Sequence, residues 1–234
     1  MTFTVIIPTL NEVGVIETTL RLTAQLGFHD IVVVDGGSTD GTRALVESEV
    51  ANSASVSGTI RLLSSSAGRA RQLNAGAAAC TTDVFVFLHA DSSLPPRARA
   101  LIEQALTNPA VVGGRFDVRF DRPSIWGRII SAFMNARSRL SRISTGDQAM
   151  FVRRPIFEQL GGFSDIPIME DIDFSTRLKR AGETAAIRER VTTSFRRWER
   201  QGPLRTILLM WLLRFLYWIG VSPHRLAGWY AAVR

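Results

Sequence analysis

Three acidic side chains lie within four positions in the segment I-M-E-D-I-D-F, residues 168–174. A carboxylate placed beside a hydroxyl group can take its proton and act as a general base. We therefore take Glu170 and Asp171 as candidate catalytic residues, with Asp171 as the candidate base. The alternative is a capping cluster, because the helix dipole also favours acidic side chains at the start of a helix.

A further acid, Asp35, directly follows an apolar run and begins the segment D-G-G-S-T-D-G-T, residues 35–42. Its carboxylate can accept hydrogen bonds from a base or ribose, and Gly37 allows the backbone to approach a ligand closely. This pattern favours nucleoside recognition. A glycine-rich turn with Asp40 as a helix cap is the alternative.

The segment F-L-H-A-D-S, residues 87–92, places Asp91 just beyond another apolar run. An acid in this position can hold a divalent cation, Mg²⁺ or Mn²⁺, against a diphosphate. His89 can reach a ribose, bind the same metal or merely fill the turn. Ala90 lies between these two residues and is expected to face the same ligand.

Two later segments carry further candidate binding residues. In T-G-D-Q, residues 145–148, Asp147 can bind sugar hydroxyls or cap a turn. In R-R-W-E, residues 196–199, Arg197 and Trp198 can close over a diphosphate and an acceptor. The alternative for this last pair is an arginine packed on a tryptophan.

The pattern of apolar runs predicts the elements that position these residues. Strands are expected at 3–7, 31–34, 59–63 and 84–88, and helices at 11–26, 40–49, 68–80 and 95–106. Strands that alternate with helices predict an α/β fold, with a mostly parallel sheet flanked by helices. Ligands bind such sheets beyond the carboxyl ends of the strands. Four polar clusters follow the four strands there, at 9–12, 35–42, 64–71 and 89–92.

The second half of the chain is less regular. Further elements are expected as a strand with one wet face at 113–120, a helix at 124–142, a strand at 148–152 and a helix at 170–181. Residues 51–58 are expected to form a surface loop.

The C-terminal segment 204–221 is apolar but is interrupted by Arg214. Its uninterrupted pieces are shorter than the ~20 residues that a membrane-spanning helix needs. We expect an interfacial helix, with Trp211, Tyr217 and Trp218 at the level of lipid headgroups and arginines on anionic lipid. Packing on the domain or on a second copy, as a homodimer, is the alternative.

Six segments together resemble the family 2 glycosyltransferases of the GT-A (Rossmann-like) fold. They are V-I-I-P-T-L-N-E, V-V-V-D-G-G-S-T-D-G-T, G-R-A-R-Q-L-N-A-G, F-L-H-A-D, G-D-Q-A-M-F-V-R-R and M-E-D-I-D-F, in this order between residues 5 and 174. The H-A-D and M-E-D-I-D-F forms look closest to a bacterial subgroup of small transferases. The resemblance implies an inverting, metal-dependent transfer, of the hexosyltransferase type, from a nucleoside diphosphate sugar to an acceptor hydroxyl.

The resemblance also implies roles for individual residues. Asp91 matches the last acid of the D-x-D motif and is expected to bind the metal, and Asp171 matches the catalytic base. His89 stands where the family has the first acid of that motif, so the metal site has one carboxylate fewer. Substrate or nucleotide contacts are expected from Pro8, Thr9, Asn11, Glu12, Asp35, Gly37, Arg69, Arg71, His89, Ala90, Asp147, Arg197 and Trp198.

Composition limits the class of protein. The chain has 234 residues, 46% of them hydrophobic, a net charge of +7 and one cysteine, so no intrachain disulfide is possible. We expect a GT-A domain over 1–200, with a nucleotide-sugar half at 1–115 and an acceptor half at 116–200, followed by an apolar helical segment at 201–234.

The charge suits an anionic ligand or an anionic membrane surface. The basic residues are dispersed and no aromatic stacking platform is evident, so no nucleic acid partner is expected. Without a signal peptide, the protein is expected in the cytoplasm or peripherally on the inner face of the cell membrane. The rival functions are a nucleotidyltransferase and a non-catalytic module that binds membranes or nucleic acid; the acceptor remains open.

Overall fold

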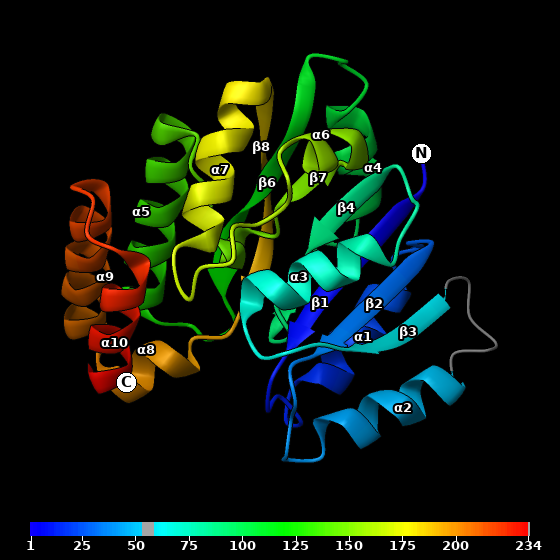
Figure 1. The fold of residues 1–234 in the computed structure, drawn as a ribbon, viewed down its shortest axis with the longest axis horizontal. Helices are drawn as coiled ribbons and strands as arrows, with labels where there is room; N and C mark the ends of the chain where they lie inside the picture. Colours follow the sequence, from blue (N-terminus) through cyan, green and yellow to red (C-terminus); the bar gives the residue numbers. More distant parts are fainter. Residues whose placement is uncertain (53–58, 234) are drawn as a thin grey trace.

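The computed structural model describes residues 1–52 and 59–233, and Figure 1 shows a central sheet with helices on both faces. Of the loop expected at 51–58, residues 51 and 52 belong to a helix, and 53–58 lie outside the described residues. The strands are β1 Phe3–Thr9, β2 Asp30–Asp35, β3 Thr59–Ser64, β4 Val84–Phe87, β5 Ser92–Ser93, β6 Val111–Phe120, β7 Phe151–Arg153 and β8 Glu183–Thr193. The helices are α1 Ile16–Ala24, α2 Thr42–Asn52, α3 Arg69–Ala78, α4 Ala98–Ala105, α5 Ile125–Ser141, α6 Arg154–Gln159, α7 Glu170–Ala181, α8 Arg196–Gln201, α9 Pro203–Trp218 and α10 Pro223–Val233, with a 3-10 turn, η2, at Gly146–Gln148.

The described strands form one mixed sheet in the order β3-β2-β1-β4-β7-β6-β8-β5. Strands β1 to β4 pair in parallel, as expected for strands joined by helical crossovers. The short strand β7 lies between β4 and β6 and runs antiparallel to both, and β5 is antiparallel to β8. The expectation of a mostly parallel sheet is therefore wrong, because β7 and β5 enter the sheet antiparallel to their neighbours.

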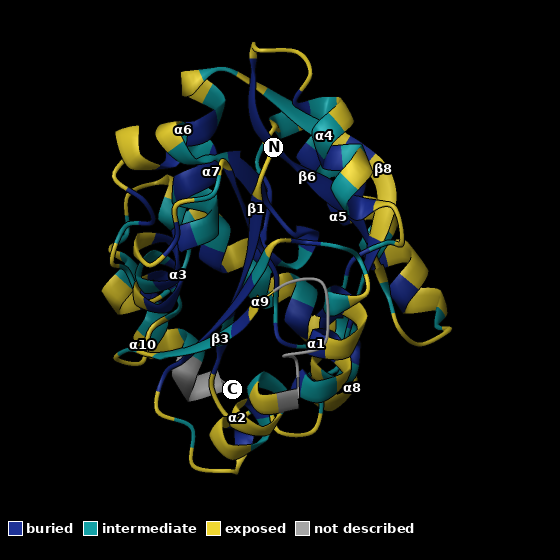
Figure 2. Cartoon of the chain, turned by 90° about the vertical axis from the view of Figure 1, so that its right-hand side faces the viewer, coloured by how far each residue is buried: buried dark blue, intermediate teal, exposed yellow. Residues whose placement is uncertain are grey.

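Two hydrophobic cores cover the two faces of the sheet. Along β1, side chains alternate between the faces, so Val5 joins one core and Ile6 the other. The first core receives side chains from α1, α2 and α4, and the second from α3, α6 and α7. Figure 2 shows the central strands β1 and β6 as buried, with exposed residues on the edge strand β8 and on the outer sides of the helices.

Two expected elements differ from the structure for identifiable reasons. The helix expected from residue 11 begins at Ile16, because Asn11 has a left-handed backbone with φ of 56° and its loop bonds to the next turn. Strand β6 was expected to have one wet face, yet its first eight residues are buried. It pairs with β7 and with β8, a strand that the sequence patterns did not predict, and α5 packs beside it.

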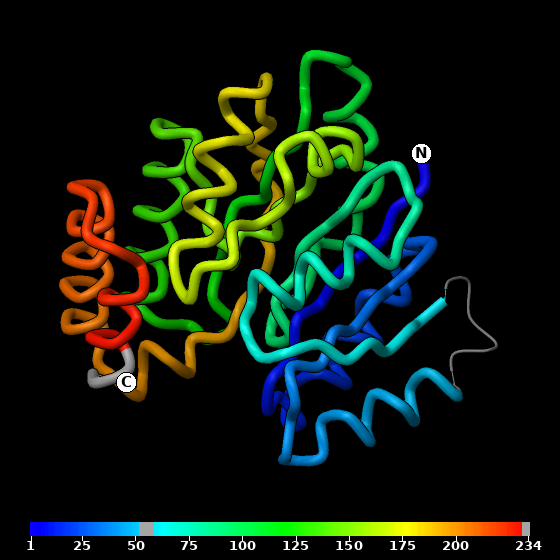
Figure 3. Tube along the Cα trace, viewed as in Figure 1, coloured from blue at the N-terminus to red at the C-terminus, as the bar shows by residue number. Residues whose placement is uncertain are grey.

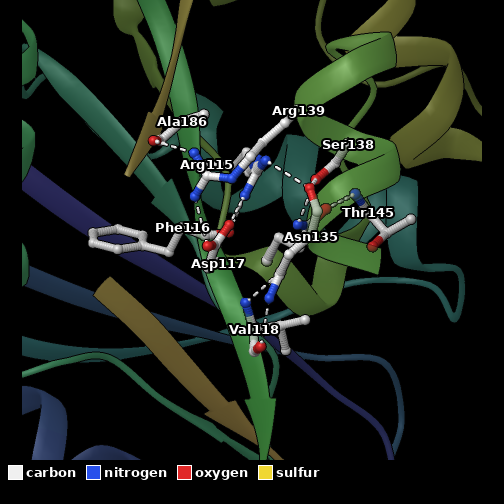
Figure 4. A network of polar contacts seen from close by, with 10 residues as sticks. Arg115, Phe116, Asp117, Val118, Asn135, Ser138, Arg139, Thr145 and Ala186 are labelled. Carbon is white, nitrogen blue, oxygen red and sulfur yellow. Dashed lines mark hydrogen bonds and ion pairs between the residues drawn. The ribbon is translucent and has the colours of Figure 1, made fainter. Parts of the chain in front are cut away.

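A polar network ties α5 to β6 (Figure 4). Asp117 accepts from Arg115 and, at 2.6 Å, from Arg139 of α5. The side-chain amide of Asn135 donates to Val118 O at 3.0 Å and accepts from Val118 N at 2.9 Å. The network fixes the position of α5 relative to the sheet.

The C-terminal helix α9 lies beside α5, and α10 packs on α9, at the end of the molecule away from β3 (Figure 3). The rings of Phe133 on α5 and Trp211 on α9 stack with their centroids 5.3 Å apart. Among the residues that the structure describes, no helix is both long and apolar enough to cross a bilayer.

Candidate functional site

The carboxyl ends of β1 and β2 place the first predicted site residues side by side. Thr9 and Asp35 are register partners at the ends of these strands, next to Pro8. The buried Asp35 carboxylate accepts from the backbone N–H of Gly37 at 3.1 Å and from Ser38, so it organises the turn after β2. Gly37 has φ of +94°, and no atom lies within 4 Å of the position that a Cβ would take. The turn therefore has open space beside it that a ligand can enter.

The loop after β1 is bonded to the turn after β2. Asn11 N donates to Ser38 Oγ at 2.9 Å, and Glu12 N donates to Thr42 Oγ1 at 2.8 Å. Asp40 accepts from the N–H of Thr42 at 3.0 Å. The hydrogen bonds therefore support the alternative prediction for Asp40, that it stabilises the start of α2.

Arg196, at the start of α8, bridges two of the predicted acids. Its guanidinium donates to Glu12 and lies 3.4 Å from Oδ2 of Asp91. Within the described part of the chain, no three His, Cys, Asp or Glu side chains are grouped so that they could hold a metal ion. Asp91 alone does not make a protein-only metal site. One carboxylate does fit Mg²⁺ or Mn²⁺ when phosphate oxygens and water supply the remaining ligands.

A second cluster forms where four segments meet: α3, the loop after β4, η2 and the start of α7. Arg69 contacts Nε2 of His89 and lies 3.3 Å from Oε1 of Glu170. His89 Nδ1 lies 3.1 Å from Oδ1 of Asp147. Because arginine can only donate, Nε2 accepts and the proton on Nδ1 is donated to Asp147. Both ring nitrogens of His89 thus have protein partners.

The surroundings in the cluster shift the pKa values of two carboxyl groups in opposite directions. Burial removes Glu170 from water and raises its pKa, with the charge of Arg69 opposing this shift. Burial would also raise the pKa of Asp147, but the hydrogen bond from His89 and the charge of Arg69 outweigh it and hold that pKa below its usual range. Environments that separate two carboxyl groups in this way are typical of functional sites.

Asp171 is fixed by backbone groups. Its Oδ2 accepts from Gly146 N at 2.9 Å, and its Oδ1 accepts from Ile172 N at 2.7 Å. Asp173 is part of a separate contact, an ion pair with Arg177 at 2.7 Å. Of the three acids at the start of α7, only the first two therefore belong to the candidate site.

Two of the predicted nucleotide contacts have other partners in the structure. Arg71 forms an ion pair with Asp165 at 2.8 Å, and neither residue joins the cluster around His89. Ala90 is buried, and its carbonyl accepts from Thr19 Oγ1 at 2.7 Å. Their expected contacts with a nucleotide stay predictions.

The predicted pair Arg197 and Trp198 is split between two neighbours. The Arg197 guanidinium lies over the ring of Tyr230 on α10, 5.1 Å from its centroid. Trp198 makes an edge contact with Phe120 of β6, with the centroids 6.0 Å apart. The alternative prediction for this segment was that the arginine packs on the tryptophan. In the structure each of the two residues packs on a different neighbour instead.

Sequence patterns missed two residues that help to build the site. Arg196 stands directly before the predicted Arg197, and only the fold shows which arginine reaches the acids. Gln72 is buried on α3, and its amide donates to Thr9 O at 2.7 Å and to Val34 O at 2.8 Å. It thereby holds the ends of β1 and β2 together. Its place in the segment G-R-A-R-Q-L-N-A-G was the available signal.

Comparison with known proteins adds a family and a fold. The sequence model of Glycosyl transferase family 2 matches residues 4–161. The mannosyltransferase PcManGT from Pyrobaculum calidifontis, solved with GDP-Man and Mn²⁺, has a TM-score of 0.66 at 24% identity, over 82% of this chain and 56% of that one. S. aureus TarS 1-349 has a TM-score of 0.64 at 16% identity, over 83% of this chain and 60% of that one. A complex of TarS 1-349 with UDP-GlcNAc has a TM-score of 0.59 at 16% identity, over 83% and 56%.

These identities show a shared fold, and the chain spans less than two thirds of the length of these relatives. No curated protein sequence matches the chain.

Proposed function

The chain belongs to Glycosyl transferase family 2, and from this premise we propose that it transfers a hexose from a nucleoside diphosphate sugar to an acceptor hydroxyl, with inversion. The observation that carries the proposal is the cluster of Arg69, His89, Asp147 and Glu170, which four separate segments bring together beside Asp171. The H-A-D and M-E-D-I-D-F forms favour the bacterial subgroup of small transferases. We also retain as a proposal the division into a catalytic domain at 1–200 and a C-terminal segment at 201–234.

The turns after β1 and β2 are proposed to hold the nucleoside. Thr9 and Asp35 end adjacent strands and Glu12 lies in the loop just beyond, at the edge where ligands bind in this class of sheet. The open space beside Gly37 leaves room for the backbone to approach the nucleotide. Arg69 lies next to this edge and can stabilise negative charge on the diphosphate.

Asp91 is the residue proposed to hold Mg²⁺ or Mn²⁺, which would neutralise charge on the departing diphosphate. The relative PcManGT was solved with Mn²⁺ and GDP-Man, which supports the assignment. Arg196 lies 3.4 Å from the Asp91 carboxylate. We propose that this guanidinium moves to the diphosphate when the donor binds.

Asp171 is proposed to be the general base. A sugar or lipid hydroxyl is a poor nucleophile until its proton is removed. The two backbone N–H groups hold the Asp171 carboxylate in one orientation, as a base must be held. Glu170 is buried and ion-paired with Arg69, so its proposed part is to orient Arg69 beside the diphosphate.

We also propose that the protein binds peripherally to an anionic membrane. Exposed apolar residues recur along one side of α9 at helical spacing: Leu204, Leu208, Trp211, Phe215 and Trp218. Exposed Ile125, Ile129 and Phe133 continue this surface on α5, which contacts α9. Exposed arginines on the same helices, including Arg128 and Arg205, suit anionic headgroups. An acceptor on a lipid or at the membrane surface is consistent with this arrangement.

Calorimetric titration with UDP-GlcNAc and with GDP-mannose, with and without Mn²⁺, tests the donor proposal. Asp91→Asn should weaken donor binding by about 10-fold or more and remove its dependence on Mn²⁺, because the cation loses its protein ligand. The matched control Asp165→Asn, in an exposed ion pair, should bind as the wild type does.

Two outcomes favour the rival functions. Binding of a nucleoside triphosphate with release of pyrophosphate would indicate a nucleotidyltransferase. Absence of binding to any nucleotide or nucleotide sugar would indicate a non-catalytic module.

A further inference from the structure

Two arginines lie near the contact between α5 and α9. The stacked rings of Phe133 and Trp211 join the two helices, with centroids 5.3 Å apart. Arg137 follows Phe133 by four residues on α5, and Arg214 follows Trp211 by three residues on α9. Residues three or four apart share one face of a helix, so each arginine stands one turn along its helix from a stacked ring.

Among the residues that the structure describes, neither guanidinium has a hydrogen-bond or ion-pair partner. Nε and Nη2 of Arg137 are buried and make no hydrogen bond. In the described ranges, Arg214, which is half-buried, forms no hydrogen bond and no ion pair either. The buried carboxylate of the network between α5 and β6, Asp117, is already paired with Arg115 and Arg139 (Figure 4).

The end of α5 that carries Arg137 lies close to the proposed base. Ser138, the neighbour of Arg137, accepts from the side chain of Gln148 in η2 at 3.0 Å. The first residue of the same turn, Gly146, donates to Asp171 at 2.9 Å. The end of α5 and the start of α7 therefore enclose one region, with η2 between them.

Electrostatics agree with this placement. Burial lowers the pKa of Arg137 to about 10, the charge of Arg214 lowers it too, and the Asp171 carboxylate raises it. Burial also lowers the pKa of Arg214, against the attraction of Asp171 and Asp147. Two desolvated cations thus share Asp171, and Asp147 is already bonded to His89.

We propose that Arg137 and Arg214 bind an oxyanion carried by the acceptor, a phosphate above all, and so present the acceptor hydroxyl to Asp171. The inference rests on the proposed function and adds to it the chemical class of the acceptor. A buried charge without a partner is costly, and a ligand that supplies the counter-charge removes that cost. The planar, forked guanidinium matches the oxygens of a phosphate, and two of them enclose it.

The first test titrates inorganic phosphate into protein saturated with UDP or GDP, so that the diphosphate position is filled. Arg137→Met and Arg214→Met should each weaken phosphate binding about 10- to 100-fold, the usual effect of losing a charge-assisted contact. Arg214→Lys should lose less, because it keeps the charge. Arg188→Met, at an exposed position on β8, is the control and should not change phosphate binding.

Unfolding of the free protein separates a binding role from a structural one. If Arg137 and Arg214 serve to bind an anion, each Met variant removes a charge that has no partner in the protein. The urea midpoint of each variant should then be equal to or higher than that of the wild type. Phosphate affinity that is equal in the wild type and both Met variants, or an absence of phosphate binding to the wild type, overturns the proposal. Met variants that unfold at lower urea and still bind phosphate normally also overturn it.

The source of the phosphate is tested with two probes that carry the same group. Glycerol 3-phosphate in solution represents a soluble acceptor, and phosphatidic acid in phosphatidylcholine vesicles represents a lipid headgroup. Binding that depends on Arg137 and Arg214 supports the proposal with either probe, and the tighter probe identifies the source. Failure of the proposed function appears separately, as absence of nucleotide-sugar binding or transfer, while the phosphate titration reports on these two arginines alone.

Discussion

At the scale of single residues, neighbouring acids at the start of α7 have different surroundings. Glu170 is buried, lies 3.3 Å from Arg69 and has a raised pKa because of its burial. Asp171 is more accessible and accepts two backbone hydrogen bonds. A group that takes a proton from an incoming hydroxyl must be reachable as well as oriented. These surroundings favour Asp171 as the base and Glu170 as the residue that positions Arg69.

Asp171→Asn is expected to lower the turnover number by about 10²–10⁴-fold, the usual contribution of a positioned base. The variant keeps the size and the hydrogen-bond acceptor of the side chain but cannot take the proton. Because a base acts in the transition state, donor affinity should change little. Steady-state transfer assays together with calorimetric donor titration measure the two effects separately.

The matched control is Asp173→Asn, because this acid is paired with Arg177 and lies outside the site. It should leave turnover close to that of the wild type. Near-normal turnover in Asp171→Asn with an inactive Glu170→Gln would move the base to Glu170. Activity in all three variants would show that the acids at the start of α7 are only structural.

At the scale of elements, the placement of α5 depends on a buried ion pair. Arg115 is buried on β6 and pairs with Asp117, which also receives Arg139 from α5. Two guanidiniums therefore share one carboxylate between a strand and a helix (Figure 4). The same helix carries Arg137 toward the proposed acceptor region, so this contact connects stability with the site.

Asp117→Asn is expected to lower the free energy of unfolding by about 3–5 kcal/mol, because it leaves buried Arg115 without a counter-charge. Urea unfolding followed by circular dichroism measures the loss. Asp165→Asn removes the exposed ion pair with Arg71 and should change the midpoint little. Equal midpoints for both variants would mean that hydrogen bonds to backbone carbonyls suffice to hold Arg115.

At the scale of the whole molecule, the apolar surface lies at one end, over α5, α9 and α10. Leu208 is 70% exposed and Trp218 is 80% exposed, whereas Leu213 on the opposite side of α9 is buried. Contiguous exposed apolar surface is unusual on a monomeric soluble protein and marks a binding surface. This surface continues into the region of Arg214, so a bound membrane would adjoin the proposed acceptor site.

Flotation with vesicles of phosphatidylcholine and phosphatidylglycerol tests this surface. Wild-type protein should float at low salt, and the double variant Leu208→Ser with Trp218→Ser should not, because both side chains insert among lipids. Raising the salt should weaken flotation by screening the arginines. Leu22→Ser, at an exposed position on α1, is the control and should float normally.

The competing occupant of this surface is a second copy of the chain. Protein that stays at the bottom of the gradient, and that becomes monomeric only in the double variant, would assign the surface to a homodimer. Sedimentation of the wild type and of the double variant, without vesicles, measures the oligomeric state.

The sequence by itself determined the first half of the fold and the positions of its acids. An apolar run between polar segments reports a buried strand locally, and β1, β2 and β4 lie where such runs predict them. Because these strands are parallel, Asp35 and Asp91 follow their carboxyl ends. The order of the motifs also indicated the family, which the match over residues 4–161 confirmed.

Only the tertiary structure decided the rest, because periodicity reports whether a face is buried and not what covers it. The segment of β8 has no apolar run, and it becomes a strand by pairing with β6. Arg196 contacts Glu12, which is 184 positions away in the sequence, and Asp91, which is 105 positions away. Arg214 interrupts an apolar segment in the sequence, and the packing of α9 on α5 is what brings it to Arg137.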